Sequence, residues 1–259
     1  MDKGIDFVVV NFYRSEYVYL LVRSIHKYTK DPYTIYIMNN GINEGEDNNY
    51  DELKELFDDD DKVVVLKGVE QEQEIKPEDT NSVECRIGGR MISIASKTKT
   101  ESQRKGIRSG NREYICLLDY DAIFLNEWVD DVLPLLEEYV FVGERWEPAL
   151  GTVKDQILLI KRKVLELYNL YPTTDYQDGS GNLTYFCHKQ HLSFTYFENS
   201  FNNRDLRKLH LLDIGNGEQC FVNDKPFYYH YARGATRDKS LYHQWITTAS
   251  NYLGGSTNE

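Results

Sequence analysis

Leu117-Leu118-Asp119-Tyr120-Asp121-Ala122-Ile123-Phe124 is the stretch that decides the fold, because it joins an apolar run to two acidic residues. The apolar run begins at Tyr114, and a short run of this kind is typical of a buried strand. The two aspartates follow at the point where this strand would end. Ligands gather at the carboxyl ends of strands in open α/β sheets, so the stretch predicts a central strand with a site beside it.

The chain before this stretch alternates between strand and helix patterns. Apolar runs predict strands over 5–10, 33–38 and 63–66. Helical spacing predicts helices that begin at Ser15 or Glu16, lie around 53–57, and cover about 92–108. This order predicts an α/β fold with a Rossmann-like, mostly parallel sheet that is flanked by helices.

The chain after the stretch continues with a less regular pattern. We expect strands over 139–143, 156–160 and 227–231, helices over 129–136 and 161–170, and loops over most of 173–220. We find no internal repeat and no linker composition. The sequence therefore predicts a single domain over 1–253 and a disordered tail over 254–259.

Composition narrows the class of protein. A net charge of −12 argues against a general nucleic-acid or membrane-surface binder, although 86–112 holds eight basic residues and one acid. We see no signal-peptide pattern and no apolar run that could span a bilayer. The four cysteines form no CxxC pair, so we expect a reducing, cytoplasmic setting.

Asp119 and Asp121 can reach one cation if the backbone turns between them. Hard carboxylate oxygens suit Mg²⁺ or Mn²⁺, and such an ion can bridge the phosphates of a nucleotide diphosphate. The alternative is a pair of loop carboxylates that caps a helix starting near Asn126. The position after a buried strand favours the metal hypothesis.

A second polar segment, 229–237, follows the last predicted strand. His230 is a candidate third metal ligand through a neutral imidazole, and the alternative is a half-buried strand histidine. Arg233 and Arg237 are candidates to pair with phosphate oxygens.

Together these segments resemble the GT-A-type glycosyltransferases, especially the family-2-like members with a DxD motif. The resemblance covers about 5–240 in islands: 8–17 resembles the first strand and nucleoside loop, 38–41 the base-contacting turn, 117–124 the DxD strand, 158–162 the stretch after the acceptor-side strand, and 230–237 the metal-histidine and phosphate segment.

The resemblance implies an enzyme with a GT-A fold and a bound Mn²⁺ or Mg²⁺ ion. It implies a nucleotide-sugar-binding half over about 1–125 and an acceptor-binding half over about 126–253. The donor would be a nucleotide-diphosphate sugar, often UDP-linked, and the acceptor a hydroxyl group on a glycan, a small molecule or modified nucleic acid.

Carried over by residue, the resemblance assigns Asn11, Arg14 and Asn39 to the nucleoside, Asp119 to ribose or metal, and Asp121 to metal. It also implies that the basic helix flanks the donor phosphates, so Arg104 or Lys105 would contact them. The alternatives for that helix are a solvated basic face, or a face that docks a polyanionic acceptor such as modified DNA.

The general base is the point where the sequence departs from the family. Inverting members carry an acidic pair there, and this chain has no clear equivalent. The candidates are Glu144, Glu147, Asp155 and Asp213, of which we choose Asp213 because it follows an apolar stretch and precedes a glycine. The alternative for Asp213 is a turn carboxylate, and a retaining enzyme would need no such base.

Two other functions compete with glycosyl transfer. A sugar-nucleotide nucleotidyltransferase would want a glycine-rich phosphate loop after the first strand, and the segment Asn11–Arg14 lacks one. A non-catalytic carbohydrate-binding protein on the same fold is the other alternative.

Overall fold

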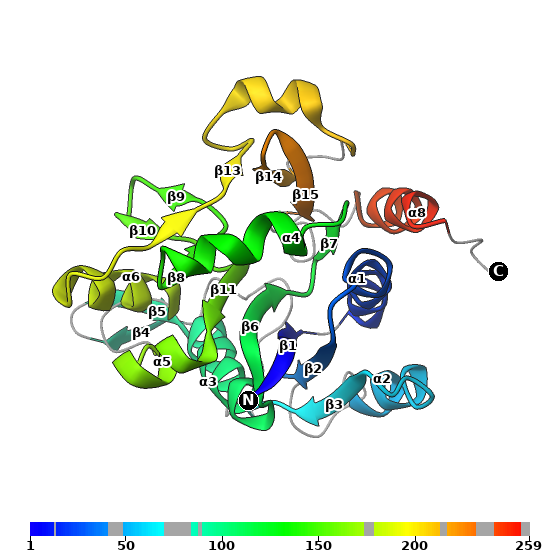
Figure 1. The fold of residues 1–259 in the computed structure, drawn as a ribbon. Coiled ribbons are helices and arrows are strands. Elements are labelled where there is room, and N and C mark those ends of the chain that lie inside the picture. Colours follow the sequence, from blue (N-terminus) through cyan, green and yellow to red (C-terminus); the bar gives the residue numbers. More distant parts are fainter. Residues whose placement is uncertain are drawn as a thin grey trace.

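The computed structural model describes residues 1–12, 14–40, 49–69, 84–87, 90–173, 179–212, 217–231 and 241–254, with the backbone alone for 84–87, 90–96, 179 and 180. A seven-stranded sheet with the order β12-β8-β11-β6-β1-β2-β3 lies at the centre (Figure 1). Its strands are β1 (Asp2–Asn11), β2 (Tyr33–Asn39), β3 (Val63–Lys67), β6 (Arg112–Asp119), β8 (Phe141–Gly143), β11 (Ile157–Lys161) and β12 (Thr195–Tyr196).

The directions of these strands confirm the predicted α/β class. β1 is parallel to β2 and to β6, and β2 is parallel to β3. β11 is antiparallel to both β6 and β8, while β12 is parallel to β8, so β11 runs against the other strands of this sheet.

Helices cover both faces of the sheet. Successive residues of a strand point to opposite faces, so they pack into two different apolar clusters. Val9 and Leu118 belong to the cluster beneath α1 and α8, whereas Val8 and Leu117 belong to the cluster beneath α3, α5 and α6. Burial on both faces explains why the strands appear in the sequence as continuous apolar runs. The helices are α1 (Ser15–Tyr28), α2 (Tyr50–Leu56), α3 (Ile94–Ser109), α4 (Val129–Val132), α5 (Arg162–Tyr168), α6 (Gly179–Lys189) and α8 (Tyr242–Tyr252).

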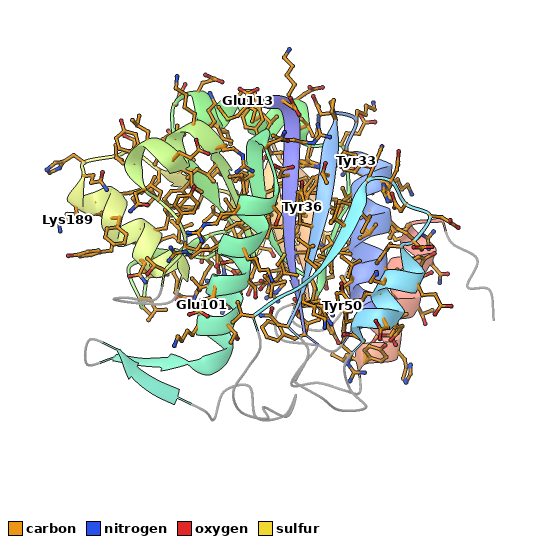
Figure 2. All side chains as sticks on the ribbon, turned by 90° about the horizontal axis from the view of Figure 1, so that it is seen from below. Tyr33, Tyr36, Tyr50, Glu101, Glu113 and Lys189 are labelled. Atoms are coloured by element: carbon orange, nitrogen blue, oxygen red, sulfur yellow. The ribbon has the colours of Figure 1, made fainter. Side chains whose placement is uncertain are left out.

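Helix α3 lies close against the sheet at Gly106. A Cβ atom at this position would lie 2.5 Å from Cγ1 of Val8 and 3.2 Å from Cγ of Met38, so the backbone of the helix approaches β1 and β2 closely. Figure 2 shows α3 beside these strands, with Glu101 at the outer surface of the helix. The close packing fixes where the side chains of α3 can reach.

A smaller, four-stranded sheet with the order β13-β14-β15-β7 follows the acidic triplet (Figure 1). β7 continues directly from the turn after β6 and pairs antiparallel with β15. Its strands are β7 (Ala122–Phe124), β13 (Glu198–Asn199), β14 (Glu218–Val222) and β15 (Lys225–His230), and two-stranded pairs are formed by β9 (Trp146–Glu147) with β10 (Thr152–Val153) and by β4 (Glu84–Ile87) with β5 (Arg90–Ser93).

The sequence patterns miss two helices. α6 begins in the glycine-rich segment 179–182, whose composition favours a turn, and it is stabilised by Leu183 and Cys187 packing into the cluster beneath α3. α8 was not predicted, and it buries Trp245 and Ala249 in the cluster beneath α1. Tertiary packing overrides local preference in both helices.

A buried ion pair joins several elements at the opposite end of the central strands from the acidic triplet. Asp6 of β1 is fully buried, and its Oδ2 lies 2.8 Å from Nη2 of Arg162 on α5. Arg162 also donates to the carbonyl groups of Ile107 and Arg112, and the backbone N–H of Arg112 donates to Asp6. Burial raises the pKa of Asp6, while Arg112 and Arg162 oppose that rise.

Candidate metal and donor site

The acidic triplet lies where the chain passes from the large sheet to the small one. Asp119 is the last residue of β6, and its backbone N–H donates to the carbonyl of Gln156 at 3.0 Å. Tyr120 is buried between them, with its ring 5.9 Å from the ring of Tyr17 in an edge-on contact. Asp121 precedes β7. The turn at Tyr120 thus allows both carboxylates to face one point.

His230 completes this cluster from the end of β15. It pairs in register with Ala122 of β7, and the N–H of Tyr231 donates to the carbonyl of Asp121 at 2.9 Å. The Nε2 atom of His230 lies 3.4 Å from Oδ1 of Asp121 and 4.0 Å from Oδ2 of Asp119. One ligand atom from each residue lies within 4.8 Å of the others, so the three predicted ligands come together.

The chemistry of these groups fits a divalent ion. Two carboxylate oxygens and one imidazole nitrogen suit Mn²⁺ or Mg²⁺. The other ring nitrogen of His230, Nδ1, lies 3.4 Å from Oε1 of Glu144, which is fully buried. A carboxylate behind a histidine ligand orients the ring and directs its free nitrogen lone pair toward the metal.

The helix-capping alternative for the triplet does not describe its contacts. α4 begins at Val129 after Trp128, without a side-chain cap. Asn126 instead donates from Nδ2 to the carbonyl of Pro226 at 2.7 Å.

A basic residue of α3, Lys99, contacts the cluster. Its Nζ lies 2.6 Å from Oδ1 of Asp119 and 3.4 Å from Oδ1 of Asp155. Burial alone would lower the pKa of Lys99, but the two carboxylates raise it. The resemblance points to this basic segment, but it assigns the phosphate contact to Arg104 or Lys105 instead of Lys99. Since α3 and β6 run in opposite directions, the early turns of α3 lie beside the end of β6, and this geometry is the signal that would have identified Lys99.

Burial and neighbouring charges shift the pKa values of the residues in the cluster. Burial raises the pKa of Asp119, Lys99 and His230 lower it, and Asp155 and Asp121 raise it further. For His230, burial lowers the pKa, but Asp121 and Glu144 outweigh this effect and hold it well above its ordinary value. Positive charge offsets the repulsion among carboxylates gathered in this way, and Lys99 supplies part of that charge between Asp119 and Asp155.

The predicted nucleoside residues lie at the same edge of the sheet. Asn11 and Asn39 end β1 and β2 in register, and Nδ2 of Asn11 donates to Oδ1 of Asn39 at 2.8 Å. Val10 is the register partner of Asp119, which places this amide pair beside the triplet. The guanidinium group of Arg14 lies over the ring of Tyr242, 5.0 Å from its centre.

The other predicted site residues are more scattered. Arg104 and Lys105 line an open cavity of about 460 Å³ on the outer side of α3, and Nζ of Lys105 donates to the carbonyl of Lys67 at 2.7 Å. Asp213, Arg233 and Arg237 lie outside the described residues. Of the remaining candidate bases, Glu144 and Asp155 join the cluster, and Glu147 pairs with Arg145 at 2.8 Å.

Within the described residues, no helix combines the length and apolar character that crossing a membrane requires.

No protein-family model and no curated protein matches the sequence of this chain. Solved structures do match. S. aureus TarS 1-349 aligns over 100% of this chain and 67% of its own, with a TM-score of 0.52 and 9% identity. The galactosyltransferase LgtC, in complex with donor and acceptor sugar analogues, aligns over 98% and 97%, with a TM-score of 0.51 and 15% identity. A mannosyltransferase from Pyrobaculum calidifontis aligns over 75% of this chain and 55% of its own, with a TM-score of 0.49 and 9% identity.

Proposed function

We propose that this chain, which has the GT-A fold of nucleotide-sugar glycosyltransferases, is a metal-dependent enzyme that transfers a sugar from a nucleotide diphosphate to a hydroxyl acceptor. We favour a UDP-sugar as the donor. The observation that carries the proposal is the convergence of Asp119, Asp121 and His230 at the carboxyl edge of the central sheet. This edge is where α/β proteins bind nucleotides.

The cluster could provide the positive charge that stabilises a nucleotide diphosphate as it leaves the sugar. A Mn²⁺ or Mg²⁺ ion held by Asp119, Asp121 and His230 would neutralise negative charge on the leaving group. Lys99 adds a fixed positive charge beside it and orients Asp155 through their 3.4 Å contact. The buried carboxylate of Glu144, 3.4 Å from Nδ1 of His230, would hold the ring in position when the metal is bound.

We keep the residue roles that the sequence predicts for donor binding and for acceptor deprotonation. Asn11, Arg14 and Asn39 would contact the nucleoside, and Arg233 and Arg237 the phosphates. Asp213 is our proposed base if the reaction inverts the anomeric centre. Glu144 is a poorer choice for a base, since it is fully buried behind His230.

Hydrolysis of the donor tests the proposal without knowledge of the acceptor. We expect the wild-type protein with Mn²⁺ to release nucleotide slowly from at least one donor in a panel of UDP- and GDP-sugars. Asp121→Ala should abolish this release and keep the wild-type melting temperature. Asp130→Ala, an exposed aspartate of α4, is the matched control and should retain full activity. Full turnover by Asp121→Ala would refute the metal assignment.

Thermal melts separate the competing functions. A stabilisation that requires both nucleotide and Mn²⁺ supports the transferase, because a ligand that binds only the folded state raises its stability. No shift with any nucleotide supports a carbohydrate-binding protein. Synthesis of a sugar nucleotide from a nucleoside triphosphate and a sugar phosphate would support the nucleotidyltransferase instead.

A further inference from the structure

An aromatic surface lies next to the metal cluster on the side of the small sheet. Tyr196 of β12 and Phe201, which follows β13, are exposed by 45% and 49%, and Trp146 of β9 is partly exposed. The rings of Trp146 and Tyr196 stack with their centres 6.1 Å apart. Nδ2 of Asn202 donates to the carbonyl of Trp146 at 2.9 Å, which brings the segment around Phe201 beside β9. Figure 1 shows β9 and β13 as neighbours.

Arg145 connects this aromatic surface to His230. Its guanidinium group lies over the ring of Phe201 at 4.0 Å, and its Nε donates to Oε2 of Glu218 at 2.8 Å. Glu218 is the cross-strand partner of His230, so their side chains project from the same face of the small sheet. Arg145 also follows Glu144 directly in the chain. The aromatic surface is therefore continuous with the residues that hold the candidate metal ligands.

Carboxylates outnumber the guanidinium group among Arg145 and the charged side chains that contact it. Arg145 is already paired with Glu147 and Glu218, and Glu144 lies beside it. The metal cluster next to it adds Asp119 and Asp121. The basic residues of the cavity on α3, Arg104, Lys105 and Arg108, lie on a helix that contributes no residue to this aromatic surface.

Aromatic rings and carboxylates side by side match the surface of a neutral sugar. A pyranose ring has an apolar face of C–H groups, which packs on an aromatic ring, and a rim of hydroxyl groups, which donate to carboxylates. Exposed aromatic groups gathered near a site also mark a binding surface more often than scattered ones do.

We propose that Trp146, Tyr196 and Phe201 form the acceptor subsite and that the acceptor is a neutral oligosaccharide. This inference rests on the proposed function for the transfer step, although binding of the sugar can be measured without it. It disfavours modified DNA as the acceptor.

Tryptophan fluorescence measures the binding directly. Trp128 and Trp245 are buried, with 1% and 0% exposure, so quenching by acrylamide reports mainly on Trp146. We expect cellobiose, maltotriose or chitobiose to protect wild-type Trp146 from acrylamide in a saturable way. Tyr196→Ala and Phe201→Ala should raise the apparent Kd of the oligosaccharide in this measurement at least ten-fold. The control is Tyr19→Ala, which replaces an exposed tyrosine of α1 and should leave that Kd unchanged.

Turnover provides the second measurement. With Mn²⁺ and a donor, the same oligosaccharides should raise nucleotide release above simple hydrolysis. The stimulated-to-unstimulated ratio should fall at least ten-fold in Tyr196→Ala and Phe201→Ala, mainly through KM of the oligosaccharide. Melting temperatures close to that of the wild type would show that these variants fold.

Three outcomes would overturn the inference. One is the absence of any protection by the three oligosaccharides. Another is stimulation of turnover by a 20-nucleotide single-stranded DNA and by none of the sugars. The third is unchanged sugar dependence in both aromatic variants. Sugar binding without any donor turnover would instead remove the proposed function and leave the sugar-binding surface in place.

Discussion

At the scale of single residues, His230 has carboxylates on both sides of its ring. Nε2 faces Asp121 and Asp119, and Nδ1 faces Glu144. A ring held in this way presents one nitrogen to the metal in a fixed direction, which lowers the entropy lost when the ion binds.

Glu144→Gln tests this arrangement. The amide keeps the size of the side chain but removes the charge behind the ring, so we expect Mn²⁺ affinity to fall by about 10- to 100-fold. Isothermal titration calorimetry with MnCl₂ measures the affinity, and Glu138→Gln on the exposed surface is the control. Equal affinity in Glu144→Gln and wild type would show that Glu144 does not support the ligand.

The sequence predicts the three candidate metal ligands of this cluster but not the residues that contact them. Asp119, Asp121 and His230 could be found because each follows an apolar run, and chain order then places them at strand ends. Lys99 and Glu144 could not be chosen among many similar residues. Their roles depend on the packing angle of α3 and on the path of the chain after β8, and these are set by tertiary contacts.

At the scale of elements, the buried pair of Asp6 and Arg162 holds β1, α3, β6 and α5 together. Arg162 donates hydrogen bonds to Asp6, to the carbonyl group of Ile107 near the end of α3, and to the carbonyl group of Arg112 at the start of β6. Because these elements also carry Lys99 and Asp119, the pair supports the site from the far end of the strands.

Asp6→Ala should destabilise the protein strongly, because it leaves a buried guanidinium group without its carboxylate. We expect a loss of about 3–5 kcal/mol in the free energy of unfolding. Urea denaturation followed by circular dichroism measures this loss. The double variant Asp6→Ala/Arg162→Met should recover part of it, since the uncompensated charge is gone. A loss below about 1 kcal/mol in Asp6→Ala would mean that water or other groups replace the carboxylate.

Helices and strands could be predicted where a short stretch of sequence shows an apolar run or helical spacing. The central strands β1, β2, β3, β6, β8 and β11 match predicted apolar runs, and α1 and most of α3 match predicted helices. β12 was missed, because it is a two-residue strand within 173–220, where the composition predicts loops. α6 and α8 could not be predicted, since a glycine-rich start hides the first and long-range packing against α1 stabilises the second.

At the scale of the whole molecule, one sheet separates the two apolar clusters. The strands β1 and β6 contribute alternate residues to both clusters, so neither cluster can lose its packing without exposing the other. The single domain over 1–253 remains a prediction, and this shared sheet is the reason to keep it.

Equilibrium unfolding tests that prediction. We expect a single cooperative transition, with tryptophan fluorescence and far-ultraviolet circular dichroism giving the same midpoint. The tryptophans sample both clusters, because Trp128 and Trp245 lie in one and Trp146 packs against the other. Separate midpoints for the two signals would indicate that the halves on either side of residue 125 unfold independently.

The passage of the chain from the large sheet to the small sheet takes place inside the acidic triplet. Asp119 belongs to one sheet, His230 belongs to the other, and Asp121 lies in the connection between them. A change in the tilt of the small sheet would therefore alter the distances among the three ligand atoms. The electron paramagnetic resonance spectrum of a Mn²⁺ ion depends on the positions of its ligands. A Mn²⁺ ion bound at this site would therefore report a rotation of the two sheets against each other as a change in the shape of its spectrum.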